Sequence, residues 1–207
     1  MDFLQRFAET LVAQGLLAED AIPWLRYAFR RRLLSLGTHL LLFGLGWWLA
    51  GPWEAFLFLF SFFLLRRRAG GYHAKTPWRC LLLSAAQLGL ALKLLLPLLL
   101  AAPRLCSWAV LLASAGAIAA TAPLLPWQLH ATAAETAACR SRTQGVLALE
   151  GAAALGLALW APRTWFLSVV LGMVGTAGSL LFEQHKRRLD HEQSEARTVA
   201  AGGEARQ

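Results

Sequence analysis

Residues 33–65 read LLSLGTHLLLFGLGWWLA, then Gly51-Pro52, then WEAFLFLFSFFLL, and three arginines follow at 66–68. The first apolar run, 33–50, approaches the roughly 20 residues with which a helix spans a bilayer. The second run, 53–65, is shorter. A segment of this length can cross the membrane in two ways. Either the bilayer is locally thinned, or the helix continues into the arginines, whose long side chains can reach the interface. The intervening glycine and proline break the pattern, so this stretch predicts a hairpin of membrane helices.

Further apolar segments follow at 81–102, 105–125, 146–160 and 164–182. Hydrophobic residues make up 57% and charged residues 15% of the 207 residues, and the mean hydropathy is +0.48. A soluble domain of this length needs more charge to cover its surface. We therefore expect an all-α membrane protein with about six transmembrane helices. A four-span arrangement, with 33–65 re-entrant or 146–182 partly interfacial, is the alternative.

The N-terminal segment 1–32 precedes these spans and is amphipathic. Phe3, Phe7 and Leu11 recur at helical spacing, and residues 22–32 mix aromatic side chains with a basic run. This composition predicts a helical segment that lies in the membrane interface; a soluble helix packed on cytoplasmic loops is the alternative. We divide the rest into a transmembrane domain, 33–182, and a polar tail, 183–207, which is expected to be disordered. No cleaved signal peptide is expected, because acidic residues interrupt the first 25 positions.

Lysine and arginine in the connections indicate the orientation. With the N-terminus inside, the basic residues at 30–32, 66–68, 140–142 and 186–188 all lie on the cytoplasmic side, and the outer side receives only Arg104 and Arg163. This distribution predicts a multi-pass plasma-membrane protein with both termini in the cytoplasm, facing an anionic inner leaflet. The net charge of +8 would also suit nucleic acid, but the basic residues gather at the ends of apolar segments, which argues against that partner.

The loop 66–80, RRRAGGYHAKTPWRC, combines residue types that suit nucleophilic catalysis. Cys80 falls where the third apolar helix begins, so the helix dipole and nearby cations such as Lys75 favour its thiolate. His73, seven residues earlier, can act as general base or pair with that thiolate. Backbone N–H groups at the helix start can stabilise an oxyanion. The alternative is a solvated loop histidine and a cysteine that serves as a small apolar residue.

The order Arg66, Gly70-Gly71, His73-Ala74 and Cys80 after an apolar hairpin resembles the accessory gene regulator B (AgrB) family of membrane peptidases. Tyr27-Ala28-Phe29-Arg30 and the pair Ala122-Pro123 agree with it, and the resemblance covers about residues 1–185. It implies a cysteine peptidase that cuts a small precursor peptide, of the accessory gene regulator D type, at the cytoplasmic membrane face. The cut passes through an acyl-enzyme thioester and contributes to a cyclic quorum-sensing peptide.

By position, the resemblance makes His73 the general base and Cys80 the nucleophile. Gly70 and Gly71 would shape the loop, and Arg66 would bind a substrate carboxylate or hold the site. The region 124–145 departs from the family because it is poor in lysine and acidic residues, which leaves substrate recognition and ring closure open. A peptide exporter and a structural membrane subunit are the other functions considered. The spans carry few polar residues, which disfavours the exporter, and a structural subunit needs no such loop.

Lys93 lies in the middle of the third span, where a lysine costs about 2.5–3.5 kcal/mol on insertion scales. Glu54 precedes Arg66 by twelve residues, and Lys93 follows Cys80 by thirteen. Both therefore lie roughly 18–20 Å from the same side at a rise of about 1.5 Å per residue. We predict an ion pair between Glu54 and Lys93; a lysine that snorkels to the outer surface is the alternative.

The remaining polar and sulfur-containing residues give weaker signals. Ser84 and Gln87 continue the helical face of Cys80 and either line a polar groove for the peptide or contact neighbouring helices. Cys139 follows His130 by nine residues without a glycine turn, and Cys106 is expected to serve in packing. The cysteines and histidines show no zinc-type spacing, so no metal or cofactor is expected. The sequence leaves open whether the protein forms a homodimer.

Overall fold

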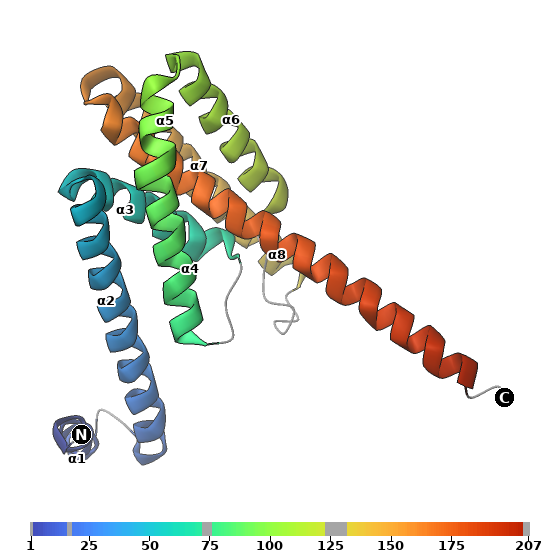
Figure 1. Ribbon diagram of the computed structural model, residues 1–207. Coiled ribbons are helices and arrows are strands. Elements are labelled where there is room, and N and C mark those ends of the chain that lie inside the picture. The colour runs from blue at the N-terminus through green and yellow to red at the C-terminus, as the bar shows by residue number, and fades with distance from the viewer. Residues whose placement is uncertain (1, 16–17, 72–75, 123–131, 205–207) are drawn as a thin grey trace. The chain divides into compact units, whose positions relative to one another are not determined.

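The computed structural model describes residues 2–15, 18–71, 76–122 and 132–204 (Figure 1). Every regular element within these ranges is helical, which confirms the all-α prediction. The helices are α1 (Asp2–Ala13), α2 (Ile22–Ala50), α3 (Pro52–Ala69), α4 (Pro77–Gly89), α5 (Leu96–Ala101), α6 (Arg104–Thr121), α7 (Ala133–Trp160) and α8 (Arg163–Glu204). A 3₁₀ turn, η1 (Glu19–Ala21), precedes α2, and a π-helical turn, η2 (Leu90–Leu95), joins α4 to α5.

The chain divides into two units, residues 1–44 and residues 45–207. The first unit contains α1, η1 and most of α2. The segment 22–32, which the sequence predicts to lie in the membrane interface, is the first part of the single helix α2. The physical reason is that Pro23 falls in the first turn, where a missing N–H is tolerated, and no proline follows before Pro52. The position of this segment in the interface stays a prediction.

Five helices of the described chain are long and apolar enough to cross a membrane: α2, α4 continued through α5, α6, α7, and α8 as far as Asp190. This finding confirms a membrane protein. The predicted second span, 53–65, belongs to α3, which ends in three arginines and does not meet the same composition criterion. The number of six spans therefore stays a prediction.

Helix α8 forms the centre of the second unit. Of its spanning segment 67% is buried, against 11–22% for the other four candidate spans. Gly172 lies directly against α3, since a Cβ atom there would meet the Phe58 carbonyl oxygen and the Ser61 side chain at 2.8 Å. One turn further, Thr176 Oγ1 lies 3.4 Å from the Phe62 carbonyl oxygen. Small residues thus bring the two backbones together, as is typical of membrane helix pairs.

Helix α7 packs antiparallel to α3 and is linked to it by two polar contacts. Thr143 Oγ1 donates to the Arg68 carbonyl oxygen at 3.2 Å, and Ser61 Oγ donates to Glu150 Oε2 at 2.6 Å. Glu150 is only 4% exposed, and its Oε1 has no hydrogen-bond partner among the residues that the structure describes. This buried carboxyl group is not among the residues predicted above, although an acidic residue within an apolar segment is a recognisable signal in the sequence.

The beginning of α7 differs from the prediction. The predicted fifth span begins at residue 146, whereas the helix begins at Ala133. A capping box explains the earlier start, because Glu135 N donates to Thr132 Oγ1 and Thr132 N donates to Glu135 Oε2. Residues 133–145, which were assigned to a connection, are therefore helical.

Most tryptophans and most basic residues of the second unit's helical bundle lie at opposite ends; Trp78, Arg104 and Arg163 are exceptions. The turns α2–α3, α5–α6 and α7–α8 carry six tryptophans within five residues: Trp47, Trp48, Trp53, Trp108, Trp160 and Trp165. The Trp53 and Trp165 ring centroids are 5.6 Å apart. We call this the tryptophan end. The end of α3 and the beginnings of α4 and α7 form the basic end. The cluster of tryptophans at the tryptophan end is typical of a membrane–water boundary.

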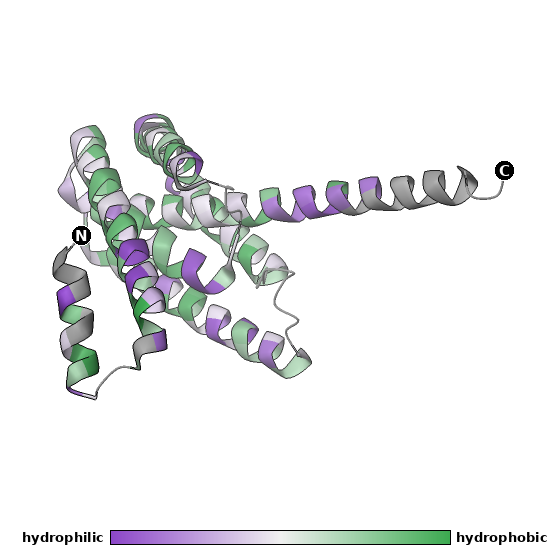
Figure 2. Cartoon of the chain, turned by 90° about the horizontal axis from the view of Figure 1, so that it is seen from below, coloured by the Kyte–Doolittle hydropathy of each residue, from purple (hydrophilic) through white to green (hydrophobic). Residues whose placement is uncertain are grey.

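Two further predictions differ from the structure. The tail from residue 183 was expected to be disordered, but α8 continues to Glu204. An ion pair from Arg187 Nε to Glu183 Oε1, at 2.9 Å and helical spacing, supports the first turns beyond the apolar part. Figure 2 shows the hydrophilic residues along this part of α8.

The predicted ion pair between Glu54 and Lys93 is absent; in the described ranges the salt bridge is the one within α8. Lys93 is exposed on η2, whereas the preceding Ala91 and Leu92 are 4% and 3% exposed and face the interior. Glu54 lies instead in the first turn of α3, where the helix dipole favours a carboxylate. Equal depth along two helices therefore did not bring the two side chains to facing surfaces.

The contact at Gly172 gives a test of the helix packing. We expect Gly172→Ala to lower the free energy of unfolding by about 1–3 kcal/mol, because the methyl group would push α8 away from α3. Thermal unfolding of the purified protein in detergent measures the effect. Gly178→Ala is the matched control, since nothing lies within 4 Å of a Cβ atom at that position of the same helix. Equal melting temperatures for the two variants would contradict the proposed packing.

Candidate active site

The double glycine that follows α3 forms a turn that only glycine adopts easily. Gly70 has φ 83° and Gly71 has φ 127°, and residues with a Cβ atom rarely adopt these backbone angles. The Gly70 N–H donates to the Arg66 carbonyl oxygen at 3.0 Å and so closes the helix. A Cβ atom on Gly71 would lie 2.7 Å from Ser179 Oγ of α8. The turn is therefore packed against α8, and the sequence needs glycine here for both backbone angle and space.

Arg66 is held at the same place by α8. Its Nη1 donates to Ser179 Oγ at 3.0 Å, and its guanidinium carbon lies 5.3 Å from the centroid of the Phe62 ring. Burial lowers the pKa of the Arg66 guanidinium, and a smaller electrostatic interaction with Cys80 raises it. Arg67 and Arg68 are exposed, whereas Arg66 is half-buried. Of the three arginines, Arg66 is thus the one that is held against α8 and interacts electrostatically with Cys80.

Cys80 lies in the first turn of α4, as predicted. Thr76 is the N-cap residue with extended backbone angles, and Pro77 occupies the first helical position. The Cys80 N–H donates to the Thr76 carbonyl oxygen at 3.2 Å. The N–H groups of Trp78 and Arg79 precede this first bond, so they have no acceptor within the helix. Two backbone donors therefore point out of the helix start beside a half-buried thiol.

The face of α4 that carries Cys80 continues into the protein interior. Ser84, Gln87 and Leu88 follow at helical spacing, and Leu88 is fully buried. The Gln87 amide occupies the space beside Gly175 of α8, where a Cβ atom would collide with it. Gln87 thus contacts a neighbouring helix, which was the alternative to lining a groove. Ser84 is half-buried between Gln87 and Cys80.

His73 and Lys75 lie outside the described residues, as does His130. The approach of His73 to Cys80 therefore stays a prediction. The other two cysteines are on different helices: Cys106 is exposed on α6 and Cys139 is half-buried on α7. Both thiols are free, as is Cys80.

Ser179 is the site residue that sequence reasoning missed. It contacts both Arg66 and Gly71, yet it lies 113 residues from Arg66 in the chain. A weak signal for it exists in the spacing of small residues along α8, which runs Gly172, Gly175, Thr176 and Ser179. Such small residues at one-turn spacing indicate a face on which another helix packs closely. The pattern does not say which helix packs there.

The packed glycine turn predicts protection of the loop from protease. We expect Gly71→Ala to speed tryptic cleavage at the basic residues of 66–79 at least severalfold, because a strained backbone and contact with Ser179 would release the turn. Gly89→Ala is the control, because a Cβ atom there meets nothing within 4 Å. Mass spectrometry of the fragments measures the rate. An unchanged rate in Gly71→Ala would show that the turn does not depend on this close approach.

In a comparison with known protein families, one family model matches this chain. The family model described as Accessory gene regulator B matches residues 4–126, which is more than half of the chain and includes the whole loop 66–80. No curated protein and no solved structure matches.

Proposed function

Because this chain belongs to the accessory gene regulator B family, membrane proteins of quorum-sensing peptide processing, we propose that it is a membrane-embedded cysteine endopeptidase. Its substrate in this proposal is a small precursor peptide, bound at the basic end, which faces the cytoplasm as the charge distribution indicates. The observation that carries the proposal is the half-buried Cys80 in the first turn of α4. Arg66, which donates a hydrogen bond to Ser179, interacts electrostatically with this cysteine.

The first step is acyl transfer to Cys80. His73 accepts the thiol proton, and the Cys80 sulfur forms a bond to the scissile carbonyl carbon of the precursor. The N–H groups of Trp78 and Arg79 stabilise the negative oxygen of the tetrahedral intermediate. The carbon–nitrogen bond then breaks, the leaving amine takes the proton from His73, and the C-terminal part departs. The N-terminal part remains on Cys80 as a thioester.

The second step determines the product. If a cysteine thiol of the precursor attacks the thioester carbonyl, Cys80 leaves as thiolate and the peptide closes into a thiolactone ring. If water attacks instead, the product is a linear acid. Cys80 lies at the beginning of an apolar helix, on the helix face that leads into the packed interior. Exclusion of water from such a position favours the ring.

The three cysteines provide a direct test of the nucleophile. We expect Cys80→Ala and His73→Ala to reduce cleavage of a candidate precursor at least 1000-fold in membranes, because each removes a partner of the covalent step. Cys106→Ala and Cys139→Ala are the controls and should retain cleavage within about twofold. Gel or mass-spectrometric detection of the released C-terminal fragment gives the rate. Full cleavage by both Cys80→Ala and His73→Ala would show that the peptidase proposal is wrong.

Arg66 is assigned a positioning role in this proposal. We expect Arg66→Gln to slow alkylation of Cys80 by N-ethylmaleimide several-fold at neutral pH, because loss of the nearby cation disfavours the reactive thiolate. The measurement uses a background in which Cys106 and Cys139 are replaced by alanine. Arg67→Gln is the matched control, since it removes an equal charge from the exposed neighbour. If the two variants react at equal rates, Arg66 does not act on the thiol.

A further inference from the structure

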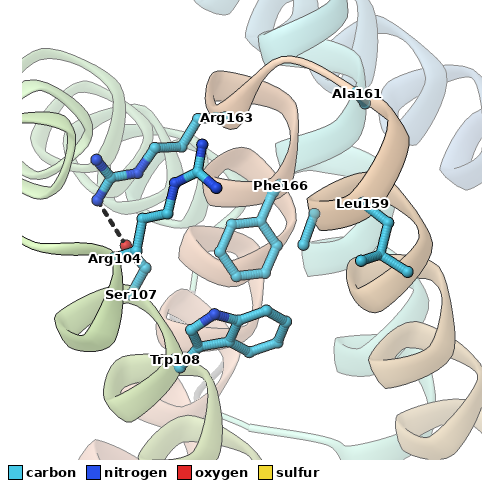
Figure 3. A pocket seen from close by; sticks show the side chains of 8 residues that line it. Arg104, Ser107, Trp108, Leu159, Ala161, Arg163 and Phe166 are labelled. Atoms are coloured by element: carbon cyan, nitrogen blue, oxygen red, sulfur yellow. Dashed lines mark hydrogen bonds between the residues drawn. The ribbon is translucent and has the colours of Figure 1, made fainter.

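A pocket of about 190 Å³ lies at the tryptophan end, opposite the candidate active site (Figure 3). The beginning of α6, the end of α7 and the beginning of α8 line it. Arg104 and Arg163 contribute two guanidinium groups, and Trp108, Leu159 and Phe166 contribute apolar surface. These are the two arginines that the charge count separated from all other basic clusters. No acidic residue lines the pocket.

Arg163 is fixed by neutral acceptors. Its Nη2 donates to the carbonyl oxygens of Leu99 and Ala102, each at 2.8 Å, and to Ser107 Oγ at 3.1 Å, the contact drawn in Figure 3. Its Nη1 donates to the Leu100 carbonyl oxygen at 3.1 Å. These bonds cap the end of α5. They leave the positive charge without an anionic partner among the described residues, and Arg163 Nε is buried without any acceptor.

Arg104 supplies a second cation that is not engaged by the described chain. It is the first residue of α6, its side chain is exposed, and neither an ion pair nor a hydrogen bond engages its guanidinium in the described ranges. Two guanidinium groups in one small pocket repel each other in the absence of an anion. Such a pair, one fixed and one adaptable, suits an oxyanion with several acceptor oxygens, because each guanidinium can donate more than one bond.

The other side of the pocket is apolar and continues onto the lipid-facing surface. The Trp108 and Phe166 rings pack with centroids 5.0 Å apart. Leu159 is 64% exposed and Trp160 is 88% exposed, so apolar side chains extend outward from the pocket. The surrounding tryptophans indicate the depth at which lipid headgroups meet acyl chains. A ligand that fills this pocket from the bilayer would present an anionic group and hydrocarbon together.

We propose that this pocket binds an anionic phospholipid of the leaflet at the tryptophan end. Its phosphate group lies between Arg104 and Arg163, and its glycerol and upper acyl chains lie along Trp108, Leu159 and Phe166. A bound lipid would tie the beginnings of α6 and α8 to the end of α7. The proposal does not depend on the peptidase chemistry at Cys80.

Lipid binding to the purified full-length protein tests the proposal. Dioctanoyl phosphatidylglycerol is titrated against wild type in a neutral detergent, and the rise in melting temperature gives an apparent affinity. Dioctanoyl phosphatidylcholine and inorganic phosphate are titrated in parallel. We expect phosphatidylglycerol to stabilise the protein at concentrations at which the other two do not. Equal effects of phosphatidylcholine would overturn recognition of the anionic headgroup, and equal effects of phosphate would overturn the lipid as ligand.

Two variants locate the binding. Arg104→Gln should weaken the response to phosphatidylglycerol roughly tenfold through loss of charge-assisted hydrogen bonds, and Arg142→Gln, which removes an exposed arginine at the basic end, should not. Ala158→Phe fills the pocket without changing charge and should weaken the response similarly. A photoreactive phosphatidylglycerol should label peptides that contain Trp108 or Phe166. Unchanged affinity in both pocket variants, or labelling confined to the basic end, would overturn the proposal.

Discussion

The close approach of α8 to α3 is the constraint on which the rest of the second unit depends. A Cβ atom at Gly172 would collide with the Phe58 carbonyl oxygen, so the two helices are in contact at backbone level. Hydrocarbon side chains gain little from leaving lipid for a protein interior, so such helices associate through dense packing and hydrogen bonds. Thr176 and Ser179 continue the same face of α8 and reach Phe62 and Arg66 of α3.

This interface also determines the geometry of the candidate active site. Ser179 is the last polar contact along the pair, and it receives both the Arg66 guanidinium and the Gly-Gly turn. Gln87 of α4 fits beside Gly175 of α8. The helix that carries Cys80 and the helix that carries Arg66 are therefore positioned by the same central helix. A site built on such elements can be precise although its loop connects two separate helices.

The two ends of the second unit have different chemistry. At the tryptophan end, the Arg163 guanidinium donates to carbonyl oxygens at the end of α5, and Arg163 shares a pocket with Arg104. At the basic end, Arg66 donates to Ser179 and interacts electrostatically with Cys80. The printed contacts of both guanidinium groups include neutral acceptors, the Ser179 hydroxyl for Arg66 and the α5 carbonyl oxygens for Arg163. A guanidinium held in this way keeps its charge and can act on a ligand or a nucleophile. The buried Glu150, in contrast, accepts a hydrogen bond from Ser61 between the two ends.

The apolar runs, their glycine and proline boundaries and the loop motif could all be read from the sequence. They predicted membrane helices, the position of Cys80 in the first turn of α4 and the family to which the chain belongs. The predictions were wrong where a local stabilising feature extends a helix, and where two distant side chains were expected to form an ion pair. The capping box at Thr132 extends α7, and the Glu183–Arg187 pair supports a helical tail. Glu54 and Lys93 lie at similar depth, but they do not meet.

The sequence by itself determined the membrane class, the helical segments and the candidate nucleophile, because hydrophobicity, turn residues and motif spacing act locally along the chain. The tertiary structure alone decided which side chains meet. Ser179 joins Arg66 across 113 residues, and Arg104 shares a pocket with Arg163. The physical reason is that lateral packing in a membrane depends on the fit of helix faces. Apolar composition is nearly the same on every face and carries little information about that fit.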